Sequence, residues 1–192
     1  MVGRWLCLLA LAAAAGAGAQ EFSIEGNCRD GAPHGAYELR GVNGQVRVVG
    51  AFARGKRTGS FLFWSPSGTR IAQLPFEDDV LSGTLALWHS PSDRRGELRP
   101  RLEAGYVAGR LHGPKRSWYA DGQLRAEYRY DHGALIEVRA FSASGRAFDA
   151  TEAKTLAAAD LVTDERHFAS LVDLLRAHAP RCGPPGARLE RG

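Results

Sequence analysis

A pattern of glycine, alternating apolar residues, a tight turn and an aromatic residue recurs along the middle of this chain of 192 residues. The leading glycines are 24, 24 and 30 residues apart, and the closing aromatic residues are 24, 30 and 24 residues apart. Self-similarity at a fixed period of this size indicates a repeat array, which constrains the fold more than any single motif does. The positions that define the repeat are Gly35, Phe52, Gly55, Gly59, Phe76, Gly83, Tyr106, Gly109, Gly113, Trp118, Gly122, Tyr130 and Gly133.

Each repeat unit is predicted to be a β-hairpin. Asn-Gly and Asp-Gly pairs lie between runs of alternating apolar residues, which is typical of a type I′ turn with positive φ at both central residues. Because side chains alternate between the two faces of a strand, the closing aromatic residues are expected to lie in one row. Ile71 breaks the alternation and predicts a bulge. The units are 35–58, 59–82, 83–112 and 113–136, followed by a partial copy over 137–148.

The predicted fold is mainly β with a C-terminal α segment. Successive hairpins over 20–148 give one antiparallel meander, which resembles a solenoid more than a layered globule. Residues 149–182 have a helical pattern, with Thr163 as an N-cap candidate and apolar residues at helical spacing around Leu171. This helix is expected to cover one face of the sheet, and residues 183–192 are expected to form a disordered tail.

The hairpin pattern resembles a known family. The segment GPKRSWYADGQLRAEYRYDHGAL is similar to the variant MORN repeats of bacterial proteins, which are often grouped under an antitoxin-like label. The segments GSFLFWSPSG and GAYELRGVNGQVRVVGAFARGK match less closely, and the third copy departs through an insertion and lacks the turn glycine. The resemblance covers roughly residues 31–148. It implies a hairpin fold and a role as an interaction module.

The first 19 residues have the pattern of a secretory signal peptide. Arg4 supplies a positive charge, WLCLLALAAAA an apolar run and AGAGA the small residues of a cleavage site. The apolar run is shorter than the about 20 residues that a membrane span needs. Cleavage is predicted after Ala19, with Ala17 as the alternative, and an uncleaved N-terminal anchor is the competing interpretation. The mature protein is therefore expected in the periplasm or outside the cell.

Two cysteines remain after such a cleavage, and we predict that Cys28 and Cys182 form a disulfide. Exported chains meet an oxidising compartment, where paired thiols tend to oxidise. Eight strands at about 4.8 Å span roughly 38 Å, and residues 150–179 reach roughly 45 Å if they are all helical. A helix of this length can return across the sheet and bring the two cysteines together. A cysteine-linked dimer and two free thiols are the alternatives.

No residue is predicted to be catalytic, cofactor-binding or metal-binding, and the protein is not expected to be an enzyme. The segment from Gly50 to Arg57 has P-loop spacing, but Arg57 stands where Ser or Thr must reach magnesium. His34 and His112 share a repeat slot and are interpreted as surface turn residues, and the FEDD segment as a polar turn that lacks the pattern of a calcium loop. A hidden hydrolase built on paired carboxylates is a further alternative.

A protein partner is the predicted ligand. Insertions in repeat proteins often lie on the binding face, so the insertion of the third copy is the expected contact. The alternative is a structural envelope protein that contacts anionic lipid or peptidoglycan through cationic turns. The net charge of +4 is spread along the chain, which argues against nucleic acid, and no nucleotide is expected. The residues expected to contact the partner are Arg94, Arg95, Glu97 and Arg99.

Overall fold

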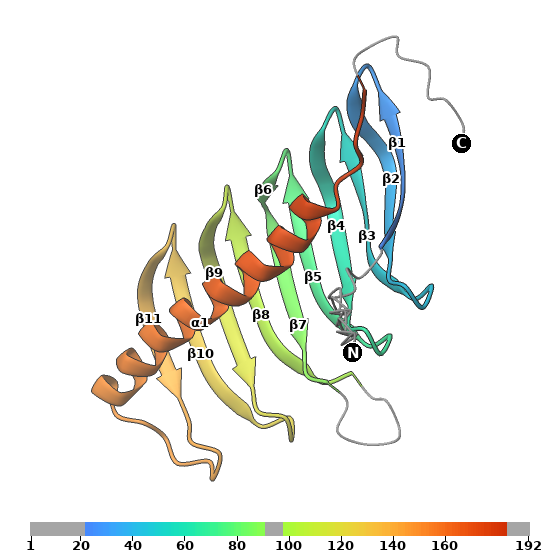
Figure 1. Ribbon diagram of the computed structural model, residues 1–192. Coiled ribbons are helices and arrows are strands. Elements are labelled where there is room, and N and C mark those ends of the chain that lie inside the picture. Colours follow the sequence, from blue (N-terminus) through green and yellow to red (C-terminus); the bar gives the residue numbers. More distant parts are fainter. Residues whose placement is uncertain (1–21, 91–97, 184–192) are drawn as a thin grey trace, which may run out of the picture.

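The computed structural model of the protein describes residues 22–90 and 98–183, which form one antiparallel sheet with one helix lying across it (Figure 1). Strands that follow one another in the chain lie side by side, except that the short strand β6 pairs only with β5, which also pairs with β7. The prediction of a mainly β meander with a C-terminal helix is confirmed. The strands are β1 (Ser23–Arg29), β2 (Ala32–Arg40), β3 (Val46–Ala53), β4 (Lys56–Trp64), β5 (Arg70–Glu77), β6 (Val80–Leu81), β7 (Gly83–Trp88), β8 (Pro100–Val107), β9 (Arg110–Trp118), β10 (Leu124–Asp131) and β11 (Ala134–Ala140).

The repeat positions occupy the same place in every hairpin. In each pair of strands the leading glycine lies opposite the closing aromatic residue, as Gly35 lies opposite Phe52 in β2 and β3. The other pairs are Gly59 with Phe76, Gly83 with Tyr106, and Gly113 with Tyr130. All four aromatic residues belong to or pack against the core on the face under the helix, which we call the covered face. The predicted row of aromatic residues is therefore confirmed.

The type I′ turns predicted inside the hairpins are found between the hairpins instead. In the turns inside the hairpins that the structure describes, only the glycine has positive φ, such as 73° at Gly44 and 92° at Gly122, so the Asn-Gly and Asp-Gly turns are not type I′. The Asn43 side chain instead accepts a hydrogen bond of 3.1 Å from the Gln45 amide, which favours a type I turn followed by a left-handed glycine. Between the hairpins both central residues have positive φ, as in Arg54 at 51° and Gly55 at 83°, and these tight turns are the type I′ ones.

One extra residue on the second strand of each hairpin forms a bulge beside the turn. The bulge predicted at Ile71 is confirmed, because Phe63 pairs with Ala72 and Trp64 pairs with Arg70. The same register shift recurs in the other three hairpins, where the extra residue is an arginine. A bulge turns its extra residue out of the normal alternation. The three arginines are Arg47, Arg101 and Arg125.

The helix α1 (Ala150–Ala177) is continuous and runs diagonally across the sheet from the β11 end to the β1 end (Figure 1). The expectation of an N-cap at Thr163 is wrong, since Asp149 caps the helix in a capping box with Glu152. Thr163 lies mid-helix and donates its hydroxyl hydrogen to the Ala159 carbonyl. Leu171 is buried against the aromatic core, as predicted. Within the described residues no helix combines the length and apolar character that crossing a membrane requires.

A disulfide between Cys28 and Cys182 closes the two ends of the array, as predicted, with the Cα atoms 5.7 Å apart. Cys28 occupies the slot that aromatic residues fill in later copies, because it pairs with Pro33 as Phe52 pairs with Arg57. Beside the disulfide, the Tyr37 hydroxyl donates a hydrogen bond of 2.9 Å to the carbonyl that follows α1. The predicted signal peptide at 1–19 and the tail from 184 onward lie outside the described residues.

Candidate interaction surface

Three tryptophans share one position on the face of the sheet opposite α1, which we call the uncovered face. Trp64, Trp88 and Trp118 end strands β4, β7 and β9. Each directly follows a residue buried on the covered face, so alternation along the strand places each tryptophan on the uncovered face. All three are half-buried. We refer to them as the tryptophan row.

The tryptophan row follows alternate strands, so its members are about 9.6 Å apart across the sheet. Strand β5 separates Trp64 from Trp88, and β8 separates Trp88 from Trp118. Arg70, which pairs with Trp64, holds its guanidinium carbon 4.3 Å from the centre of the Trp88 ring. The contact is a cation–π interaction that fixes the Trp88 ring. The result is a partly exposed platform of large aromatic side chains, in which the Trp88 ring is held by Arg70.

Sequence reasoning named Trp118 as a structural repeat position and missed the row. The signal was present, because the three tryptophans are spaced by 24 and 30 residues, like the repeat itself. The first copy has Arg40 at this position, where it pairs with the Glu38 carboxylate on the same face. The row therefore spans the second, third and fourth hairpins.

A charged hollow lies on the uncovered face over β9, β10 and β11. Its volume is about 610 Å³. Glu127 joins two strands, because it accepts a hydrogen bond of 2.8 Å from Arg116 and another from Arg139. These two hydrogen bonds lower the pKa of the Glu127 carboxyl below its ordinary value. Arg129 and Glu137 complete the charged lining, which we call the arginine–glutamate hollow.

The predicted contact residues of the third copy fall mostly outside the described chain. Arg94, Arg95 and Glu97 are not described. Arg99 is described, and its guanidinium donates hydrogen bonds to the carbonyls of Ala120 and Asp121 at 3.5 and 3.2 Å. Arg99 thus ties the end of the insertion to the turn of the next hairpin. Its predicted contact with a partner stays a prediction.

Two cations in the turns expected to favour an anionic surface are paired with carboxylates. Arg57 donates to the Asp79 carboxylate at 2.7 Å, and Lys56 lies 3.6 Å from Asp78. Partial burial acts to raise the pKa of Asp79, but the hydrogen bonds from Arg57 outweigh it and lower this pKa. The FEDD segment is therefore a polar turn that already holds two cations. Another cation, Lys115, is withdrawn from the surface, since it is buried in strand β9 under the helix.

A polar pocket of about 320 Å³, which the sequence did not predict, lies beneath α1 and is lined by Arg125, Asp160 and Asp164 among other residues. Lys115 contacts the wall of this pocket through Asp164. Its ammonium lies 2.7 Å from the Asp164 carboxylate of the helix. Arg125 makes two hydrogen bonds of 2.7 and 2.8 Å to Asp160, which also accepts one from the Tyr128 hydroxyl. Burial, followed by the charge of Asp160, raises the pKa of Tyr128 far above its ordinary value. These ion pairs and hydrogen bonds satisfy the polar groups beneath the helix, and they hold the helix against the sheet.

The bulge explains why Arg125 is in that pocket. Strict alternation predicts that Arg125 and the tyrosines of β10 point to opposite faces, and for Arg125 this is wrong. The extra residue in β10 turns the Arg125 side chain to the covered face, where it meets Asp160. Arg129, beyond the bulge, is exposed on the uncovered face as alternation predicts.

The residues with P-loop spacing, from Gly50 to Arg57, do not form a P-loop. These residues form the end of β3, a type I′ turn and the start of β4, with no helix after them. Gly50 is needed for packing, because a Cβ atom there would lie 2.4 Å from the buried Phe61 ring.

The expectation that His34 and His112 are surface turn residues is wrong, because they lie half-buried in strands β2 and β9. His34 accepts a hydrogen bond of 3.4 Å from the amide of Arg54 in the neighbouring turn.

The fold and this surface define a class of protein: an antiparallel array of β-hairpins, closed by one helix and a disulfide, with an aromatic platform on its uncovered face. No protein-family model and no curated protein matches the chain.

Proposed function

We propose that the protein is a non-catalytic, exported repeat protein of the variant MORN type that binds another protein through the uncovered face of its sheet. The observation that carries the proposal is the tryptophan row. Tryptophan and arginine dominate the binding energy of protein interfaces, because a large rigid ring loses little conformational entropy on binding. One half-buried tryptophan is ordinary, but three at one repeat position with a stacked arginine form a regular contact surface.

Two features support export. The N-terminal residues have the signal-peptide pattern, and the chain carries a disulfide of the kind that persists in oxidising compartments. The hairpins with their aromatic core support the MORN-like assignment, which implies an interaction module and no particular chemistry. Binding to an anionic envelope surface is less well supported, since Lys115 is buried and Arg57 and Arg116 are paired with carboxylates.

Removing the tryptophan row is expected to abolish partner binding. The mature protein is used to capture its partner from an envelope extract of the source cell, and the dissociation constant of the recovered pair is then measured. We expect Trp88→Ala to weaken binding at least about tenfold, and the triple variant with Trp64→Ala and Trp118→Ala about a hundredfold or more. Val162→Ala is the matched control, because Val162 is an exposed apolar residue of α1, with 55% of its surface accessible.

Circular dichroism and an intact disulfide establish that the variants are folded. The proposal fails if the triple variant binds as well as the Val162 control. It also fails if binding disappears steeply with added salt, because that dependence indicates attraction to an anionic surface.

A further inference from the structure

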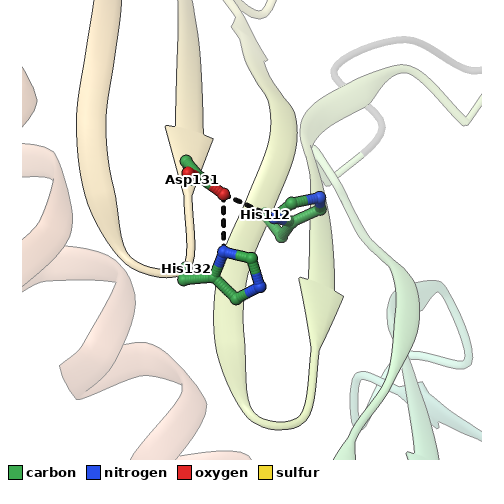
Figure 2. A group of neighbouring side chains, drawn as sticks. All are labelled: His112, Asp131 and His132. Atoms are coloured by element: carbon green, nitrogen blue, oxygen red, sulfur yellow. Dashed lines mark hydrogen bonds and ion pairs between the residues drawn. The ribbon is translucent and has the colours of Figure 1, made fainter.

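Two histidines and an aspartate meet at one end of the uncovered face. Asp131 ends β10, His132 begins the tight turn that leads to β11, and His112 lies on β9 next to the paired residues Gly113 and Tyr130. Figure 2 shows both rings turned toward the same carboxylate. The Nδ1 atom of His132 is 2.5 Å from Asp131 Oδ1, and that of His112 is 3.3 Å from the same oxygen.

Hydrogen bonding accounts for only one of the two rings. His132 is aligned to hydrogen-bond with Asp131. The Nδ1 atom of His112 is buried and makes no hydrogen bond in the described chain, although it lies near the Asp131 carboxylate. The two rings also pack against each other, with their centres 4.7 Å apart. Two imidazole nitrogens and one carboxylate oxygen therefore converge, and the three residues offer ligand atoms that lie within 4.8 Å of one another.

The first hairpin provides an internal comparison. His34 occupies the same slot there as His112 does in the fourth hairpin, because each directly precedes the repeat glycine. The residues that correspond to Asp131 and His132 are Ala53 and Arg54, which offer no metal ligand. The repeat fold therefore does not require this cluster. The three candidate ligand residues come together because of the particular side chains present at the fourth hairpin.

We propose that His112, Asp131 and His132 bind a divalent transition metal of the zinc class. Imidazole nitrogen with carboxylate oxygen suits Zn²⁺ and its neighbours, whereas Ca²⁺ and Mg²⁺ prefer oxygen ligands alone. Three protein ligands leave one tetrahedral position for water or for a group from a binding partner. Zinc bonds of about 2.0–2.1 Å set ligand atoms roughly 3.4 Å apart, which rotation of the partly exposed side chains achieves. This site is independent of the tryptophan row.

The test is calorimetric titration of the mature, tag-free protein with Zn²⁺, and the absorption spectrum with Co²⁺ as a second readout. We expect one Zn²⁺ per chain, the intense visible bands of tetrahedral Co²⁺, and no comparable binding of Ca²⁺ or Mg²⁺. The variants His112→Ala, Asp131→Asn and His132→Ala are each expected to bind at least tenfold more weakly. The control His34→Ala is expected to bind like the unchanged protein.

All three ligand residues are on the surface or near it, so the variants are expected to keep the thermal unfolding temperature of the metal-free protein. The proposal is overturned if the unchanged protein takes up no Zn²⁺. It is equally overturned if His112→Ala binds as the His34→Ala control does, because the ligands then lie elsewhere. Neither result bears on partner binding by the tryptophan row, so the two proposals fail separately.

Discussion

Replacing both Cys28 and Cys182 with serine is expected to lower the free energy of unfolding by about 2–5 kcal/mol. The disulfide joins residues separated by 154 positions, so it removes a large amount of chain entropy from the unfolded state. It also fixes the terminal strand β1, whose residues are all exposed and which therefore has little packing of its own. Denaturant unfolding of the double variant beside the unchanged protein measures the difference.

The same measurement with reductant separates the bond from the substitution. Reductant is expected to bring the unchanged protein to the stability of the double variant and to leave the double variant as it was. A free-thiol content of two before any reductant is added contradicts the disulfide. So does a mass that halves on reduction, because that change indicates a dimer linked through these cysteines.

Removing the carboxylate of Asp164 is expected to destabilise the protein by about 3–5 kcal/mol, because it leaves the Lys115 ammonium buried without its ion partner. The Lys115 side chain is only 3% exposed, so solvent cannot replace the lost carboxylate. The variant Asp164→Leu tests this by denaturant unfolding. The double variant Lys115→Leu with Asp164→Leu is the control, and it is expected to regain most of the lost stability.

The repeat itself gives the reason for that recovery. Tyr37, Phe61 and Leu85 occupy the position of Lys115 in the other three hairpins, and all are buried and mostly apolar. An apolar pair in the fourth hairpin therefore matches the rest of the array. Equal destabilisation by the single and double variants contradicts this account, and so does a single variant within about 1 kcal/mol of the unchanged protein.

The hairpins and the aromatic row were predictable because they depend on periodicity, and the disulfide was predictable from the expected export and the length of the helix. Positions such as Phe52 and Phe76 fall on one face by simple alternation, and the length of a helix decides whether Cys182 can reach Cys28. Apart from the export that the disulfide requires, these features need only the period of the sequence and standard strand and helix dimensions.

The turn types and the polar pocket were not predictable in this way. The Asn43 side chain accepts a hydrogen bond from the Gln45 amide in its own turn, and this local bond favours type I over type I′. Arg125 reaches the covered face only because a bulge interrupts the alternation. The sequence around Lys115 predicts an exposed cation. Its ion partner, Asp164, lies in the helix 49 positions further along the chain. Each of these depends on a partner or an irregularity that periodicity does not encode.

The two candidate sites also differ in how far the sequence predicts them. The tryptophan row repeats with the period of the fold, so the sequence contains it. The cluster of His112, Asp131 and His132 depends on cross-strand register and on the turn that follows β10, because its members come from two strands and a turn. His34 and His112 share a repeat slot but belong to different hairpins, so the sequence predicts that they lie apart. It does not reveal that His112 meets a different histidine.

Photo-crosslinking in intact cells tests the central claim, which is that the uncovered face binds a protein. A benzophenone amino acid replaces Leu62, beside the tryptophan row on β4, in one variant and the exposed Lys154 of α1 in another. Our account predicts a cross-linked band with one protein from position 62 and none from position 154. A band from position 154 alone, or no protein band from either position, would contradict it.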